Sequence, residues 1–197
     1  MQSLRGRRSL SNHHRGPESR AKRLATAKKT LEEAHFSTKV YTFSTAIADA
    51  EKVKSMFAEV REQVELDVLV LNAGMGNKPS PTLDIPVDEF WKKIEINVRA
   101  NMSFVTEFLK PKTILNVSTT IAHIRLPSLA PYGASKEAFV ALLDHVQAEY
   151  KDKGIKIVSF HPSVVYTSMA KSAGFDEKTF DYDQGSDPWP LIRSSGC

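Results

Sequence analysis

The sequence predicts an α/β protein built on a doubly wound parallel sheet. Three apolar runs of four or five residues alternate with longer segments of helical period: VLVL at 68–71, TILNV at 113–117 and KIVSF at 156–160. Short apolar strands separated by helices are typical of parallel sheets, whose right-handed crossovers place helices on both faces. A further β segment is predicted before them, from the sequence VYTF at 40–43. The composition, 41% hydrophobic and 25% charged residues, is that of a globular domain able to bury a core.

Four segments predict the helices of this fold. Residues 21–34 are rich in Ala, Lys, Leu and Glu, which are good helix formers, and contain neither Gly nor Pro. Residues 48–64 repeat apolar side chains at spacings of three and four, which places one apolar stripe on a helix. A third helix is expected to begin near Pro86 and to end before Pro111, and a fourth to cover residues 132–150.

Charge and cysteine content exclude several classes of protein. The net charge is +4, but residues 1–30 hold nine basic side chains and one acidic one, so the remainder carries a net charge of −4. No aromatic residues interleave with the basic segment, and we therefore expect no nucleic-acid interface. The single cysteine, Cys197, can form neither an intrachain disulfide nor a thiolate cluster, and we expect no metal site. No segment approaches the ~20 apolar residues that cross a bilayer, so we expect no membrane association and a cytoplasmic location.

The chain is expected to divide into three parts. Residues 1–18 are basic and poor in apolar side chains, which predicts a disordered leader without the apolar region of a secretory signal. A mitochondrial transit peptide has a similar composition, and a misplaced start of the reading frame is a further alternative. The α/β domain is expected at 19–175, and residues 176–197 are expected to form an irregular tail.

Polar side chains follow two of the predicted strands at their carboxyl ends. Asn72, Ala73 and Gly74 come after the first strand, and Ser118 and Thr119 come after the second. Because open α/β sheets bind ligands at the carboxyl ends of their strands, we expect a site at this edge. Taken alone, Asn-Ala-Gly is equally well a turn, and hydroxyls at a strand end often satisfy only local backbone groups.

Tyr132 and Lys136 form a third group. They lie four residues apart on a predicted helix, so their side chains share one face. An ammonium beside a phenol favours the ionised form, and a phenol whose pKa is lowered from about 10 to about 7 is a general acid or base at neutral pH. By itself, such a pair is more often an ordinary surface contact.

Occurring together and in this order, the motifs resemble those of the short-chain dehydrogenase/reductase family, which has a Rossmann-like fold. The resemblance covers roughly residues 19–174. The matching segments are Asn-Ala-Gly at 72–74, Asn97 within the sequence INV, LNVST at 115–119, the Tyr-x-x-x-Lys pair at 132 and 136, and PSVVYT at 162–167.

The resemblance implies a role for each matching residue. Tyr132 would exchange a proton with the substrate carbonyl or alcohol, and Lys136 would lower the pKa of Tyr132 and hold the ribose hydroxyls of the cofactor. Ser118 and Thr119 would orient the substrate oxygen, with Thr119 in the catalytic position by the spacing to Tyr132. Asn97 would position a water of the proton relay. The implied cofactor-binding residues are Asn72, Ala73 and Gly74 on the adenosine side, Asn97, Tyr132 and Lys136, and Val165 and Thr167 at the nicotinamide carboxamide.

The resemblance also implies an activity and its cofactor. Members reduce a ketone or oxidise a secondary alcohol of a small molecule, often in secondary metabolism, with a nicotinamide cofactor that carries the hydride. We expect NADP, with NAD as the alternative, because Arg20, Lys22 and Arg23 lie where the family often binds the 2′-phosphate. A homo-oligomer is typical of the family and is expected through the helices around Phe104 and Phe139.

The sequence departs from the family at the phosphate-binding turn. The family carries a Gly-rich turn after a first strand, and its backbone N–H groups receive the pyrophosphate. This chain contains no such turn, so we expect a sheet that lacks the first β-α-β unit and the C-terminal strand. Two hypotheses follow: an NAD(P)(H)-dependent oxidoreductase, or a truncated and catalytically inactive remnant that is at most an interaction fragment.

Overall fold

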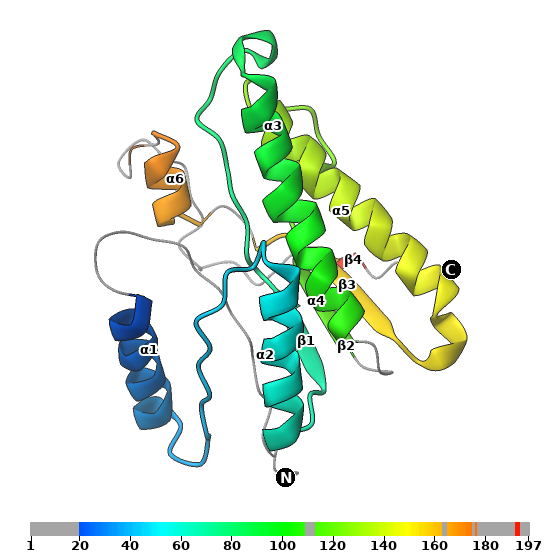
Figure 1. Cartoon of the computed structure of the whole chain (residues 1–197). Helices are drawn as coiled ribbons and strands as arrows, with labels where there is room; N and C mark the ends of the chain where they lie inside the picture. Colours follow the sequence, from blue (N-terminus) through cyan, green and yellow to red (C-terminus); the bar gives the residue numbers. More distant parts are fainter. Residues whose placement is uncertain (1–19, 109–112, 163–164, 175, 177–191, 194–197) are drawn as a thin grey trace.

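The chain forms a four-stranded sheet with helices packed on it (Figure 1). The computed structural model describes residues 20–108, 113–162, 165–174, 176 and 192–193. The predicted leader, 1–18, lies outside the described residues, as does most of the predicted tail. Because the sheet contains parallel strands joined by helices, the predicted α/β fold class is confirmed.

The three predicted apolar runs are the parallel strands of the sheet. They form β1 (Val68–Leu71), β2 (Thr113–Val117) and β3 (Lys156–Phe160). These strands pair in parallel, in the order β1-β2-β3. Their carboxyl ends therefore meet at one edge of the sheet, and that edge carries the candidate site.

One face of the sheet is covered by helices and holds the hydrophobic core. The helices on this face are α2 (Ala50–Gln63), α3 (Val87–Ile94), α4 (Asn101–Glu107) and α5 (Ala130–Glu149). The largest apolar side chains of the core come from both layers: Phe57, Val105, Phe139 and Leu143 from helices, and Leu69, Leu71, Ile114 and Ile157 from strands. Burial of this apolar surface is the main stabilising contribution to the fold.

The opposite face of the sheet is only half-buried, which corrects the expectation of strands buried on both faces. Burial alternates along β1 and β2, so Val68 and Val70 are less buried than Leu69 and Leu71. An apolar run therefore does not require two covered faces. Side chains of a strand alternate between faces, and among the described residues one face carries the helical layer of the core.

The prediction of a β-strand at 40–43 is wrong, because this segment forms no backbone ladder with another described strand. Residues 38–46 run extended between α1 (Arg20–Ala34) and α2, but they belong to no strand (Figure 1). The backbone N–H of Val40 donates instead to Glu32 Oε1 at 3.2 Å. A strand needs a neighbouring backbone ladder, and none of the described residues supplies one to this segment.

The predicted helix from Pro86 is one continuous helical run with a change of winding in its middle. After α3, residues Glu95–Ala100 form a π-helix, η2, before α4 continues to Glu107. Short π segments within α-helices are frequent at functional sites. Here the wider turn contains Asn97, one of the predicted site residues.

Short elements complete the described part of the chain. Three 3-10 helices are η1 (Thr82–Asp84), η3 (Thr120–Ala122) and η4 (Lys151–Lys153), and a short helix, α6 (Ser168–Ser172), follows β3. The tail was expected to be irregular, but its residues Ile192–Arg193 form β4, antiparallel to β3. None of the helices that the structure describes is long and apolar enough to cross a membrane.

Candidate functional site

The predicted site residues converge where β1 and β2 end and α5 begins. Asn72, Ala73 and Gly74 follow β1 directly, and Ser118 and Thr119 follow β2. The register pairs Leu71 of β1 with Asn116 of β2, so the two polar segments leave the sheet side by side. The first turns of α5, which carry Tyr132 and Lys136, pack beside η3, the 3-10 helix that follows Thr119.

Tyr132 lies against Thr119. The phenol is largely buried, and burial raises its pKa above the ordinary value of 10.0, while a side-chain hydrogen bond with Thr119 lowers that pKa in part. The Thr119 hydroxyl also accepts the backbone N–H of Ile121 at 3.4 Å and so caps η3. The Tyr132 phenol and the Thr119 hydroxyl thus lie close together at the carboxyl end of β2.

Lys136 lies behind this pair and is 5% exposed. Its Nζ donates to the backbone oxygen of Val117 at 2.9 Å, and burial lowers its pKa from 10.5 to about 8. The expected lowering of the Tyr132 pKa by Lys136 is not observed, because the Lys136 ammonium is directed to the end of β2 and burial of the phenol has the larger effect. Among the described residues, no carboxylate pairs with this ammonium.

Asn97 is fully buried and holds the loop that follows Gly74. Its Oδ1 accepts the backbone N–H of Met75 at 2.7 Å, and its Nδ2 donates to the Met75 carbonyl at 3.0 Å and to Ser135 Oγ at 2.8 Å. A Cβ built on Gly74 would lie 3.5 Å from Asn97 Oδ1 and 3.6 Å from Lys136 Nζ. The backbone of Gly74 therefore packs directly over Asn97 and Lys136.

Ser118 differs from Thr119 in its environment. Its side chain is buried, and its Oγ has no hydrogen-bond partner among the described residues. Of the two neighbouring hydroxyls considered from the sequence, Thr119 is the one that contacts Tyr132.

Val165 and Thr167 lie on the segment that leads into α6. Val165 is 51% exposed, and the Thr167 hydroxyl accepts the backbone N–H of Ala170 at 3.3 Å as the N-cap of α6. Met169 of α6 packs against Gly76 of the loop after β1, because a Cβ built on Gly76 would lie 3.2 Å from Met169 Cγ. No described contact joins Val165 or Thr167 directly to Tyr132 or Lys136.

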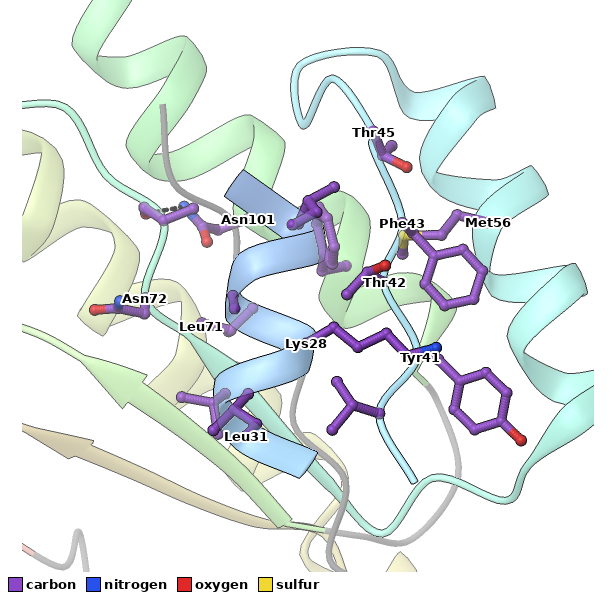
Figure 2. A pocket seen from close by; sticks show the side chains of 16 residues that line it. Lys28, Leu31, Tyr41, Thr42, Phe43, Thr45, Met56, Leu71, Asn72 and Asn101 are labelled. Carbon is purple, nitrogen blue, oxygen red and sulfur yellow. Dashed lines mark hydrogen bonds between the residues drawn. The ribbon is translucent and has the colours of Figure 1, made fainter. Parts of the chain in front are cut away.

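A cavity of about 110 Å³ lies beside the carboxyl end of β1 (Figure 2). It lies between α1, the extended residues 40–45, α2, α4 and the end of β1. Asn72 and Ala73 line it, whereas Gly74 does not. Its other side chains are mostly apolar, with Lys28 of α1 at its rim and Asn101 on α4.

Two asparagines that organise the site were missed in the sequence. Asn101 donates from Nδ2 to the carbonyls of Ala73 and Ile96, at 3.2 and 3.1 Å, and fastens the loop to the helix. Asn77 is buried beside the first turn of α5. Asn101 lies within an apolar helical stretch, and this position predicts a buried amide that needs hydrogen-bond partners. No group of metal-binding side chains occurs in the part of the chain that the structure describes.

The chain is similar in sequence to known short-chain dehydrogenases. The family model described as short chain dehydrogenase matches residues 16–178. A short chain dehydrogenase/reductase of Aspergillus aculeatus is 32% identical over 148 residues, which are 73% of this chain and 51% of that protein. A 3beta-hydroxysteroid dehydrogenase of Mediterraneibacter gnavus is 30% identical over 76% of this chain and 57% of its own length. The chain thus spans little more than half the length of these relatives.

The fold agrees with solved structures as well. Carveol dehydrogenase from Mycobacterium avium, in complex with NAD, superposes with a TM-score of 0.72 at 22% identity, over 78% of this chain and 58% of that one. A gluconate 5-dehydrogenase from Burkholderia cenocepacia, in complex with NADP and tartrate, gives a TM-score of 0.71 at 20% identity, over 82% and 65%. With its fold and the family match over residues 16–178, the chain belongs to the short-chain dehydrogenase/reductase family.

Proposed function

We propose that the chain carries the catalytic centre of an NAD(P)(H)-dependent oxidoreductase that interconverts a ketone and a secondary alcohol of a small molecule. The observation that carries this proposal is the buried Tyr132 phenol, which lies beside the Thr119 hydroxyl and near the buried Lys136. When both groups face one substrate oxygen, the phenol can donate a proton to that oxygen and the hydroxyl can donate a second hydrogen bond to it.

Each of these side chains has one task in the proposed reaction. Tyr132 gives its proton to the carbonyl oxygen in reduction and takes it back in oxidation. Thr119 orients that oxygen, and Lys136 holds the ribose hydroxyls and replenishes the proton on Tyr132. Asn97 keeps the loop after β1 in place. A bound nicotinamide would supply the hydride.

The residues present fit the nicotinamide-ribose end of such a cofactor. The Lys136 ammonium has no carboxylate partner among the described residues, and Gly74 presents no side chain above it. The fit is incomplete at the pyrophosphate, because the sequence contains no Gly-rich turn. We propose NADP with NAD as the alternative: one relative is named an NADPH-dependent reductase, while solved neighbours contain NAD or NADP.

Titration of the purified chain with NADPH, with NADH in parallel, tests this proposal. Saturable micromolar binding, followed by nicotinamide fluorescence, supports it, and we then expect Tyr132→Phe to abolish turnover of carbonyl substrates while binding persists. A folded chain that binds neither nucleotide would contradict it. That outcome favours the second candidate, a catalytically inactive fragment.

Cytoplasmic location and assembly of identical copies are further parts of the proposal. The helices around Phe104 and Phe139 remain the proposed contact, but other side chains of the helices would form it. Phe139 is 1% exposed, and Phe104 packs edge-on against Phe57 at 5.8 Å between ring centroids. Among the exposed side chains of α3 and α5, Trp91 and Leu142 are apolar candidates for a contact between copies.

A further inference from the structure

The first turn of α5 lacks a capping residue of its own. The N-cap position is Leu129, whose side chain cannot accept a hydrogen bond, and Pro131 at the second helical position has no N–H. The first N–H groups of a helix have no partner within it and need an acceptor from elsewhere. In α5, one of these N–H groups belongs to Tyr132, the proposed proton donor.

Asn77 supplies this acceptor from 55 positions earlier in the chain. Its Oδ1 accepts the Tyr132 backbone N–H at 3.3 Å, and its Nδ2 donates to the carbonyls of Lys78, at 2.8 Å, and Ser128, at 3.2 Å. Asn77 is 8% exposed, and one acceptor and two donor contacts engage its amide. A buried amide used in this way holds one geometry, because losing any contact would leave a buried polar group without a partner.

The turn that leads into α5 is held by the same contacts. Ser128 has a φ of 70°, a left-handed conformation that is unfavourable for a residue with a Cβ. Its carbonyl accepts from Asn77 Nδ2 and from the backbone N–H of Ser80 at 3.1 Å. Two bonds from the loop after β1 therefore stabilise the turn from which Tyr132 follows.

We propose that Asn77 is a positioning residue for Tyr132: it caps α5 from the loop after β1 and thereby keeps the Tyr132 phenol on the Thr119 hydroxyl. Tyr132 lies in the first turn of α5, and the terminal turns of helices fray when their N–H groups lose an acceptor. The direction of the Tyr132 side chain consequently depends on the Asn77 cap. The catalytic meaning of Asn77 rests on the proposed function, whereas its effect on Tyr132 does not.

The experiment is NMR of the full chain with 13Cζ-labelled tyrosine. The chain has five tyrosines, and Tyr132→Phe identifies the signal of Tyr132. Thr119→Val gives the reference shift for a phenol without the Thr119 hydrogen bond. We expect Asn77→Ala to move the Tyr132 signal at least halfway to that reference. Asn77→Asp keeps an acceptor for the Tyr132 N–H but loses both donor contacts of the amide, so we expect it to move the signal by less than half of that distance.

Asp49→Ala is the matched control. Asp49 caps α2 by accepting the backbone N–H of Lys52 at 3.1 Å, so this change also removes one helix cap, but far from the site in sequence. It is expected to lower the melting temperature without moving the Tyr132 signal. An Asn77→Ala chain that melts lower but keeps the wild-type signal would show a purely structural role and overturn the proposal.

The remaining outcomes are also decisive. If Asn77→Ala does not fold, Asn77→Asp alone decides: a Tyr132 signal that moves by less than half of the distance to the Thr119→Val reference supports the cap, and a signal at the Thr119→Val position contradicts it. A Thr119→Val chain with an unchanged Tyr132 signal would refute the hydrogen bond on which the proposal depends. Since the measurement needs neither cofactor nor substrate, its result is independent of the NADPH titration that tests the proposed function.

Discussion

Replacing Lys136 by methionine is expected to make the protein more stable at pH 7 and to remove part of the pH dependence of its stability. Burial lowers the pKa of Lys136 from 10.5 to about 8, and this difference corresponds to about 3 kcal/mol of penalty for the charged form. The substitution also removes the hydrogen bond to the Val117 carbonyl, worth about 1 kcal/mol. At pH 7 the methionine variant should therefore be more stable by about 2 kcal/mol.

The sign of the pH dependence follows from proton binding. Between pH 8 and pH 10.5 the unfolded chain keeps the proton of Lys136, whereas the folded chain releases it. The free energy of unfolding of the wild type therefore rises with pH in this window, and below pH 8 the full penalty is present. The variant lacks this rise, so its advantage should shrink steadily from pH 8 to pH 10 and then reverse once only the lost hydrogen bond remains.

Urea unfolding of both chains at pH 7, 8, 9 and 10 measures this difference. Lys54→Met is the control, because Lys54 is an exposed lysine of α2 and its replacement makes the same change of residue type at the surface. The argument that burial penalises the charged form of Lys136 would be refuted by one result. In that result, the Lys136→Met chain is less stable than the wild type at pH 7, and the difference in stability does not depend on pH.

Three further substitutions test the packing around the site, each by urea unfolding. Gly133→Ala should destabilise by about 1–3 kcal/mol although alanine favours helices, because the new Cβ would lie 2.9 Å from Ile121 Cγ2 and 3.1 Å from its carbonyl oxygen; a more stable variant would contradict the close approach. Phe139→Ala should cost about 3–5 kcal/mol, since the ring is 1% exposed; a loss below 1 kcal/mol would place it outside the core. Ser118→Ala should change stability by less than about 0.5 kcal/mol or increase it, because its hydroxyl has no partner among the described residues, and a larger loss would reveal one.

The strands and helices were readable because each carries a local pattern. The apolar runs at 68–71, 113–117 and 156–160 are the strands that the structure contains, and helical periodicity located α2 and α5 within two residues at each end. Residues 40–43 have the same β-forming composition but no pairing neighbour among the described residues. A sequence window records propensity, whereas a strand exists only when another backbone lies beside it.

The candidate site was predictable only as a set of residue types. The order of Asn97, Thr119, Tyr132 and Lys136 predicted the family, and the structure brings the last three to one strand end. The direction of the Tyr132 pKa was not predictable, since it depends on how deeply the phenol is buried. Spacing on a helix shows that two side chains can meet, but their surroundings decide which partner each one takes.

The sequence by itself determined the family, the three parallel strands and the side chains that we propose for proton transfer. The tertiary structure alone decided which hydroxyl meets Tyr132, where the Lys136 ammonium points, and that Asn77 caps the helix of Tyr132. The physical reason is that strand and helix patterns arise from neighbours in sequence. Burial, desolvation and a hydrogen bond between residues 55 positions apart arise from neighbours in space, which no local pattern records.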